Sequence, residues 1–126
     1  MKVVILAGGL GTRLSEYTKS IPKPMVKING KPILIHIINH YLKYGFDDFY
    51  IALGYKGNFI KNYFKKNKVN FKVNLIDTGS KTMTGGRLKR LKKKLGNDTF
   101  LLTYGDGISN VNLNKLIKFH KKNKKL

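Results

Sequence analysis

The sequence KVVILAGGLGTR, residues 2–13, is the clearest indication of the fold, because an unbroken apolar run leads directly into a glycine-rich turn. A run such as Val3–Ala7 is typical of a strand buried on both faces of a parallel sheet. The glycines of the turn let backbone N–H groups approach a phosphate or a base without obstruction by a Cβ atom. Thr12 adds a hydroxyl, and Arg13 adds a permanent cation whose planar fork matches phosphate oxygens. We therefore expect a buried first strand that leads into an anion-binding turn.

This turn fits neither of two common glycine-rich phosphate loops. No Gly-Lys-Ser/Thr ends it, so it is not a P-loop, and Leu14 stands where a dinucleotide fingerprint has its third glycine. A flexible glycine turn without a ligand is the plain alternative, and the polar pair Thr12 and Arg13 favours binding instead.

Short apolar runs and amphipathic stretches alternate along the rest of the chain. Further strands are expected at 47–54, 70–76 and 99–104. Helices are expected at 32–45 with Pro32 first, at 58–67, around 88–96, and from 112 with Asn112 as its cap. This order predicts a parallel sheet with right-handed crossovers.

Three chemically loaded segments follow the first, third and fourth expected strands, at 8–23, 77–87 and 105–107. In parallel sheets of this kind, ligands bind outside the carboxyl ends of the strands. We therefore expect the three segments to meet in a single cleft.

Two single residues in these segments carry chemistry of their own. Lys23 lies between Pro22 and Pro24, which restrict the backbone and reduce the entropy lost in aiming one ammonium at a phosphate. Asp106 lies between two glycines at a strand end, where one carboxylate can hold Mg²⁺ together with substrate phosphates. The plain alternatives are a surface lysine and an ordinary turn aspartate.

Two further patterns have a functional and a structural interpretation. Thr82–Arg87 again combines hydroxyls, glycines and an arginine, although a helix-start loop capped by Thr84 explains it equally. His36 and His40 have the i, i+4 spacing of a metal pair, but no third ligand is indicated. We expect these two histidines to be solvated.

The charge of the chain is extreme, with 26 Lys and Arg against 6 Asp and Glu, a formal net charge of +20 over 126 residues. A nucleic-acid-binding module is one interpretation. Only 3 of the basic residues are arginine, which base recognition favours, so we attribute most of the lysine to coding bias. No cysteine and no apolar run of membrane-spanning length is present. We expect a cytoplasmic protein without a membrane or a specific nucleic acid as partner.

Two motifs, VILAGGLGTRL at 4–14 and IPKPM at 21–25, together resemble the signature of the sugar-1-phosphate nucleotidyltransferases, and among these most closely the glucose-1-phosphate cytidylyltransferases. The likeness continues at GKPIL (30–34), LGYKG (53–57), DTG (77–79), MTGGRLKR (83–90) and TYGDG (103–107). It implies a Rossmann-like, three-layer α/β/α fold with a mainly parallel sheet. It also implies nucleotidyl transfer from CTP to a sugar 1-phosphate, with Mg²⁺ as cofactor, in nucleotide-sugar synthesis for lipopolysaccharide O antigen.

The same resemblance implies roles for individual residues. The nucleotide would be lined by Leu6, Ala7, Gly8, Gly9, Leu10, Gly11 and Thr12, with Gly105 against it. Arg13 would bind the triphosphate, and Lys23 would engage the α-phosphate region and the sugar phosphate. Thr82 and Arg87 would belong to the cytidine pocket. Asp106 would be one of two aspartates on Mg²⁺, so Arg13, Lys23 and Asp106 are the expected catalytic residues.

The chain also departs from the family pattern. Family members carry an additional segment where this chain has the short turn 64–70, and their second metal aspartate and most of their sugar pocket lie in a later half. We therefore expect residues 1–126 to be the nucleotide-binding half of a catalytic domain, with exposed apolar surface on its fourth strand and last helix and a homo-oligomer at full length. A non-catalytic nucleotide-binding remnant and a basic nucleic-acid-binding module are the alternatives.

Overall fold

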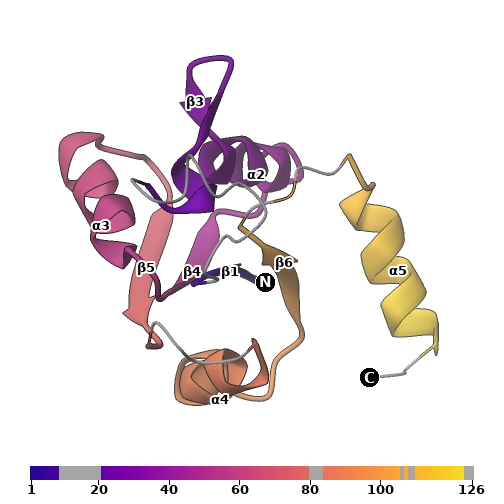
Figure 1. Ribbon diagram of the computed structural model, residues 1–126. Helices are drawn as coiled ribbons and strands as arrows, with labels where there is room; N and C mark the ends of the chain where they lie inside the picture. The colour runs from indigo at the N-terminus through magenta and orange to yellow at the C-terminus, as the bar shows by residue number, and fades with distance from the viewer. Residues whose placement is uncertain (9–20, 80–83, 106, 108–109, 124–126) are drawn as a thin grey trace.

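A four-stranded parallel sheet organises the chain, in a computed structural model that describes residues 1–8, 21–79, 84–105, 107 and 110–123. Its strands are β1 (Lys2–Ala7), β4 (Asp48–Leu53), β5 (Lys72–Asp77) and β6 (Phe100–Tyr104). They lie in the order β5-β4-β1-β6, and every neighbouring pair is parallel (Figure 1). The chain therefore builds outward from β1 to β5 and then returns to the other side of β1. The strand order reverses between β1 and β6, which is where open α/β sheets bind their ligands.

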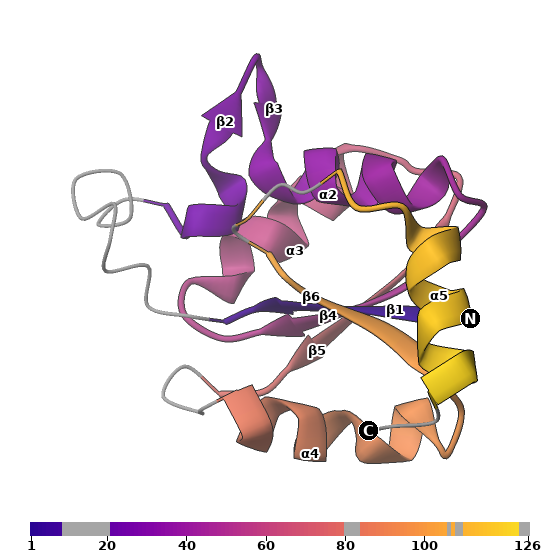
Figure 2. The ribbon, with the colours of Figure 1, turned by 90° about the vertical axis from the view of Figure 1, so that its right-hand side faces the viewer.

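Helices cover both faces of this sheet. The helices are α2 (Ile33–Leu42), α3 (Gly57–Lys66), α4 (Thr84–Leu95) and α5 (Leu113–Asn123). Figure 2 shows α2 and α3 on one face and α4 on the other, with α5 beyond β6 at the side of the sheet. The three-layer α/β/α arrangement expected from the sequence is confirmed.

The first strand is buried on both faces, as its unbroken apolar run predicts. Its side chains alternate between two apolar clusters, one under α2 and α3 and the other under α4. The larger cluster includes Ile5, Leu34 and Phe49, all fully buried, and the smaller one holds Val4 against Leu91. The strand that leads into the glycine-rich segment is thereby fixed from both sides.

Two elements differ from the sequence expectation. The first helix begins at Ile33 rather than at Pro32, because Pro32 belongs to a small antiparallel hairpin, β2 (Lys27–Ile28) with β3 (Lys31–Pro32). Asn29 and Gly30 form its turn with φ values of 52° and 79°. Positive φ at both central residues is the requirement of a type I′ turn, for which Asn-Gly is the preferred pair.

The predicted helix ends and cap are confirmed. Gly45 and Gly96 follow α2 and α4 with φ values of 85° and 65°, the left-handed conformation that ends a helix. At the last helix, the N–H of Lys115 donates to Oδ1 of Asn112 at 3.1 Å. The carboxamide satisfies one of the free N–H groups at the start of α5.

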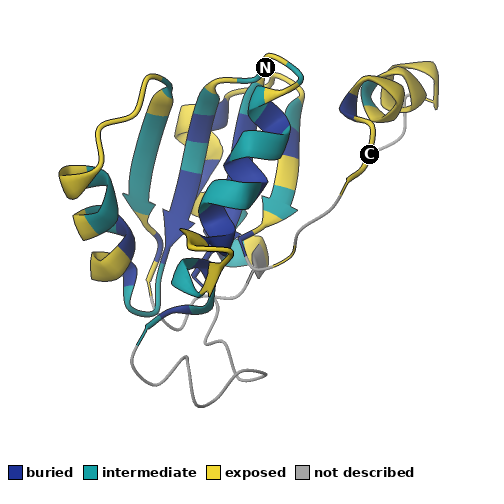
Figure 3. Cartoon of the chain, turned by 90° about the horizontal axis from the view of Figure 1, so that it is seen from above, coloured by how far each residue is buried: buried dark blue, intermediate teal, exposed yellow. Residues whose placement is uncertain are grey.

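One edge of the molecule stays apolar and uncovered. Leu102 and Tyr104 on β6 are 45% and 58% exposed, and Phe119 on α5 is 67% exposed. Figure 3 shows this contrast between the buried centre of the sheet and an α5 that is exposed over most of its surface. The expectation of exposed apolar surface on the fourth strand and last helix is confirmed. No helix within the described residues is long and apolar enough to cross a membrane.

Candidate functional site

The candidate site lies at the carboxyl ends of the four parallel strands, to the left in Figure 2. The described parts of the segments 8–23, 77–87 and 105–107 begin at this edge, where they follow β1, β5 and β6. Gly105 lies directly beside β1, because its N–H donates to the carbonyl of Leu6 at 2.9 Å. A Cβ atom at Gly105 would lie 3.2 Å from that of Ala7, so the two strand ends approach closely only with glycine here.

Lys23 is held at this same end of the molecule by a single turn of 3-10 helix, Lys23–Met25. Pro22 and Pro24 on either side are buried, and Lys23 itself is half-buried. The turn is closed by two bonds, from Met25 N–H to the Pro22 carbonyl at 2.9 Å and from Val26 N–H to the Lys23 carbonyl at 3.1 Å. The backbone of Lys23 is fixed as the flanking prolines predict.

Arg87 is buried, with 4% of its surface exposed, and its guanidinium bonds to the ends of three strands. Nη2 donates to the carbonyl of Gly8, after β1, at 2.7 Å. Nη1 donates to the hydroxyl of Thr78 at 2.7 Å and to the carbonyl of Gly79 at 2.9 Å, both after β5. A longer contact of 3.4 Å joins Nη1 to the carbonyl of Leu53, the last residue of β4.

The electrostatics of this arrangement are unusual for a buried cation. Within the described residues, every acceptor of Arg87 is a carbonyl or a hydroxyl rather than a carboxylate. Burial, with a smaller contribution from Arg90, lowers the pKa of the Arg87 guanidinium. Arginine stays protonated all the same, so a positive charge lies beneath the strand ends, where it attracts anions.

Several predicted site residues lie outside the described residues. These are Gly9, Leu10, Gly11, Thr12, Arg13, Thr82 and Asp106. The structure does describe the residues that flank them, and it brings Gly8, Arg87 and Gly105 to one edge of the sheet. These three residues form a rim at this edge, and the single cleft and the roles of the remaining residues stay predictions.

Two residues of this rim were not singled out from the sequence. Thr78 is fully buried, and its hydroxyl donates to the Leu53 carbonyl at 2.8 Å while it accepts from Arg87. Gly54 follows β4, and a Cβ atom there would lie 2.5 Å from Nη1 of Arg87. A signal for Gly54 was present, because it ends an apolar strand in the same way as Gly8.

Both histidines of the i, i+4 pair are in contact with backbone carbonyls. The Nε2 of His36 lies 2.6 Å from the carbonyl of Ile28, and that of His40 lies 2.8 Å from the carbonyl of Val111. Both rings are half-buried, which corrects the expectation of solvated side chains. No cluster of three or more potential metal ligands occurs in the part of the chain that the structure describes.

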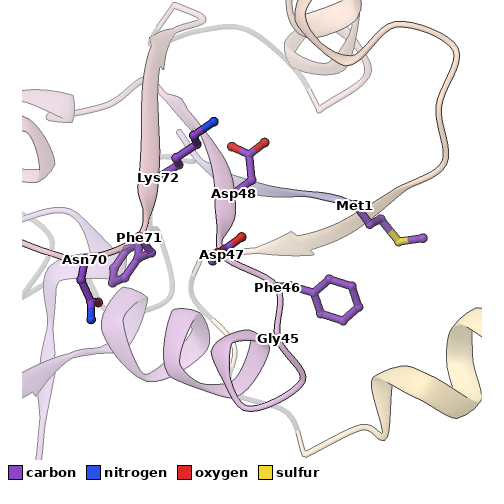
Figure 4. A pocket seen from close by; sticks show the side chains of 8 residues that line it. All are labelled: Met1, Gly45, Phe46, Asp47, Asp48, Asn70, Phe71 and Lys72. Carbon is purple, nitrogen blue, oxygen red and sulfur yellow. The ribbon is translucent and has the colours of Figure 1, made fainter.

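A separate hollow of about 650 Å³ opens at the opposite, amino ends of the strands. Figure 4 shows side chains around it, including Phe46, Asp47 and Lys72. None of the predicted site residues lines it. Open α/β sheets bind their ligands outside the carboxyl ends of the strands, so this hollow is not the candidate site.

Comparison with known proteins identifies the family of the chain. A family described as nucleotidyl transferase matches residues 2–126. The chain is 45% identical to a probable glucose-1-phosphate cytidylyltransferase of Bacillus subtilis and 48% identical to the glucose-1-phosphate cytidylyltransferase of Salmonella typhimurium. These matches cover 95% and 96% of this chain but 56% of each relative. The chain thus spans about half the length of the relatives it matches.

Two further relatives carry a different nucleotide in their descriptions. A D-glycero-alpha-D-manno-heptose 1-phosphate guanylyltransferase of Campylobacter jejuni is 39% identical over 92% of this chain and 52% of its own length. The crystal structure of HddC from Yersinia pseudotuberculosis complexed with GMP-PN superposes with a TM-score of 0.85 at 37% identity. It covers 94% of this chain and 53% of that one.

The lengths of these alignments also differ. The alignment with the Salmonella protein runs over 144 positions but includes 96% of the 126 residues here, about 121 residues. That relative therefore has about 23 residues opposite gaps in this chain. The Campylobacter alignment has 116 positions for 92% of the chain, about 116 residues, and so needs no such gaps. A parallel sheet whose strand order reverses beside a glycine-rich segment, together with a match over residues 2–126, establishes that the chain belongs to the nucleotidyl transferase family.

Proposed function

We propose that this chain is the nucleotide-binding half of a sugar-1-phosphate nucleotidyltransferase that uses CTP and glucose 1-phosphate. The observation that carries the proposal is that Gly8, bonded to Arg87, and Gly105, bonded to Leu6, lie at the carboxyl ends of β1 and β6, on either side of the switch point of the sheet. Identity of 45–48% to glucose-1-phosphate cytidylyltransferases supports the choice of nucleotide and sugar. The products are a CDP-sugar and pyrophosphate.

The proposed reaction needs no general base from the protein. A phosphate oxygen of the sugar 1-phosphate attacks the α-phosphorus of CTP in line, the bond from that phosphorus to the bridging oxygen breaks, and pyrophosphate leaves. Because the attacking oxygen is already anionic, the protein has to position the reactants and stabilise the developing charge. The segment 6–12 and Gly105 line the nucleotide in this proposal. Thr82 and Arg87 form the side of the cytidine pocket.

Two cations bind the phosphates in this proposal. Arg13 holds the triphosphate and steadies the departing pyrophosphate, and Lys23 engages the α-phosphate region. Support for Lys23 comes from its buried proline neighbours and closed turn, which leave little backbone entropy to be lost when its ammonium binds.

In this proposal, Asp106 would be a protein ligand of Mg²⁺. The bond from Gly105 N–H to the Leu6 carbonyl brings the chain that enters position 106 against the end of β1. One carboxylate plus substrate phosphate oxygens is the donor set that Mg²⁺ accepts. The metal supplies charge neutralisation at the phosphates when bound. Asp106 would hold that cation.

The uncovered edge at β6 supports the assignment of this chain as half of a catalytic domain. Leu102 and Tyr104 lie exposed on a strand that is paired on one side only, among the described strands. In the proposal, the part of the relatives that has no counterpart here covers β6 and α5 and supplies the sugar pocket and second metal aspartate. The full-length protein is then a cytoplasmic homo-oligomer that serves O-antigen synthesis and has neither a membrane nor a specific nucleic acid as partner.

GTP is the second candidate nucleotide. The gap-free Campylobacter alignment and the HddC superposition favour it, because the cytidylyltransferase relatives carry about 20 residues that this chain lacks. In the structure, α3 and β5 are joined by only residues 67–71. We place the missing residues there.

Pyrophosphate release by the protein from the complete reading frame tests the proposal. CTP with glucose 1-phosphate and Mg²⁺ is compared with GTP, UTP and dTTP. Lys23→Ala is expected to lower kcat/KM by about 10²-fold or more, as for loss of one preorganised charge donor. Lys27→Ala, an exposed lysine on β2, is the matched control and is expected to stay within about twofold.

Each other outcome has a defined meaning. Absence of product with all four nucleotides refutes the transferase proposal. Binding of CTP without turnover indicates the non-catalytic remnant. Preference for GTP overturns the choice of base while it leaves the reaction class intact.

A further inference from the structure

Glycine occurs at two of the strand ends that surround the Arg87 guanidinium. A Cβ atom at Gly8 would overlap Cζ and Nη1 of Arg87 and would lie 2.9 Å from Nη2. A Cβ atom at Gly54 would lie 2.5 Å from Nη1 and 2.8 Å from the Gly8 carbonyl oxygen. Neither glycine has the positive φ that requires glycine for conformational reasons. The space occupied by the guanidinium explains why no side chain stands at either position.

We propose that Arg87 is a positioning residue, whose guanidinium fills the space left by Gly8 and Gly54 and ties the carboxyl ends of β1, β4 and β5 together. The three arms of this tie are the bonds to the Gly8 carbonyl, to the Leu53 carbonyl, and to Thr78 with Gly79. These arms span as many as 79 residues of sequence.

The guanidinium has no inexpensive way to move aside. Arginine is a flexible side chain, and in most settings its far end would rotate away from a new methyl group. Here that rotation breaks bonds to the carbonyls of Gly8 and Gly79 and to the hydroxyl of Thr78, and two of these acceptors, those of Gly8 and Thr78, belong to buried residues. A methyl group at Gly8 therefore tests whether Arg87 is held in place.

The tie has a consequence for the nucleotide, which rests on the proposed function. The Gly8 carbonyl accepts from Arg87 at 2.7 Å and from the Tyr55 N–H at 3.3 Å. With its carbonyl held by two donors, Gly8 fixes the direction in which the chain leaves β1 for the glycine-rich segment. Arg87 thus acts on the nucleotide through Gly8, rather than only by touching the base.

A double-mutant cycle on the protein from the complete reading frame tests the tie without any assay of activity. Gly8→Ala is expected to lower Tm by about 5–10 °C in the native background, the range for forced overpacking. In an Arg87→Ala background the same substitution is expected to lower Tm by less than about a third of that amount, because the atoms it overlaps are gone. Where Arg87→Ala does not fold, Arg87→Gln takes its place.

Gly85→Ala is the matched control, since nothing lies within 4 Å of a Cβ atom there. It is expected to leave Tm unchanged or slightly higher in both backgrounds, as alanine favours helix α4. Equal losses from Gly8→Ala in both backgrounds would show that the glycine is needed for another reason and would overturn the proposal.

Nucleotide affinity supplies a readout that general destabilisation does not move. Titration calorimetry with CTP and with GTP, below the Tm of every variant, is expected to show affinity reduced about 10-fold or more in Arg87→Ala. Guanidinium at millimolar concentration is expected to restore part of the lost nucleotide affinity, whereas ammonium at the same concentration is not. Loss of affinity without coupling to Gly8 makes Arg87 a direct ligand only, and refutes the tie. If the native protein binds neither nucleotide, the proposed function fails, while the Tm cycle still decides the role of Arg87.

Discussion

Thr78→Val keeps the shape of a fully buried side chain and removes its hydroxyl. Two hydrogen bonds disappear, the one that Thr78 donates to the Leu53 carbonyl at 2.8 Å and the one that it accepts from Arg87 at 2.7 Å. A neutral bond contributes about 1 kcal/mol, and a bond to a charged group contributes about 1.5–3 kcal/mol. Both partners keep another hydrogen bond, because the Leu53 carbonyl still accepts from the Thr78 N–H and Arg87 still donates to the Gly79 carbonyl. We therefore expect the free energy of unfolding to fall by about 2–3 kcal/mol.

Thr78→Ser is the matched control, because it keeps the hydroxyl and loses one methyl group. Its expected cost is about 1 kcal/mol, from the transfer of one buried methyl. Urea unfolding with an unchanged m-value measures both variants. If Thr78→Val costs no more than Thr78→Ser, the hydroxyl does not stabilise the strand ends and the reasoning is refuted.

Three smaller effects are also expected. Gly30→Ala should lower the free energy of unfolding by about 1 kcal/mol, because φ is 79° there and alanine is strained in that region; an unchanged urea midpoint contradicts this. Burial raises the pKa of Tyr41, and a hydrogen bond to Thr103 opposes this with a smaller effect. The neutral phenol therefore stabilises the folded state below the unfolded pKa of about 10, and this stability is lost as the pH rises through the folded pKa. Tyr41→Phe should then show a smaller fall in urea midpoint between about pH 9 and 11 than the native protein, and equal falls would count against it. Lys61→Ala should change the free energy of unfolding by no more than about 0.5 kcal/mol, because the 2.8 Å ion pair with Asp77 is exposed to solvent, and a loss above about 1 kcal/mol would show otherwise.

Sequence patterns predict the sheet well, because a strand buried on both faces consists of consecutive apolar residues. The run at Val3–Ala7 is typical of a buried strand, and the structure pairs it in parallel with β4 and β6. The hairpin at β2 and β3 was missed because Pro32 also suits a helix start. The pair Asn29 and Gly30, read as a type I′ turn, would have identified it.

The environment of Arg87 could not be predicted in the same way. Three of its acceptors are backbone carbonyls, which every residue has, so they leave no mark on the sequence. Gly8 and Arg87 are also 79 positions apart, and only the completed β1, β4 and β5 bring them together. The sequence predicts both Gly8 and Arg87 as site residues, but their contact is a property of the fold.

The hydrogen bonds between Arg87 and its described acceptors do not depend on pH in the acidic and neutral range. A guanidinium keeps its charge to far above neutrality, and carbonyl and hydroxyl oxygens do not ionise at all in the range where enzymes work. A carboxylate partner would instead weaken on acidification, as its charge was lost. The bonds among the described strand ends therefore persist across acidic and neutral solutions alike. A loss of nucleotide binding in acid then comes from protonation of the ligand's phosphates or of residues other than Arg87 and its four partners among the described residues.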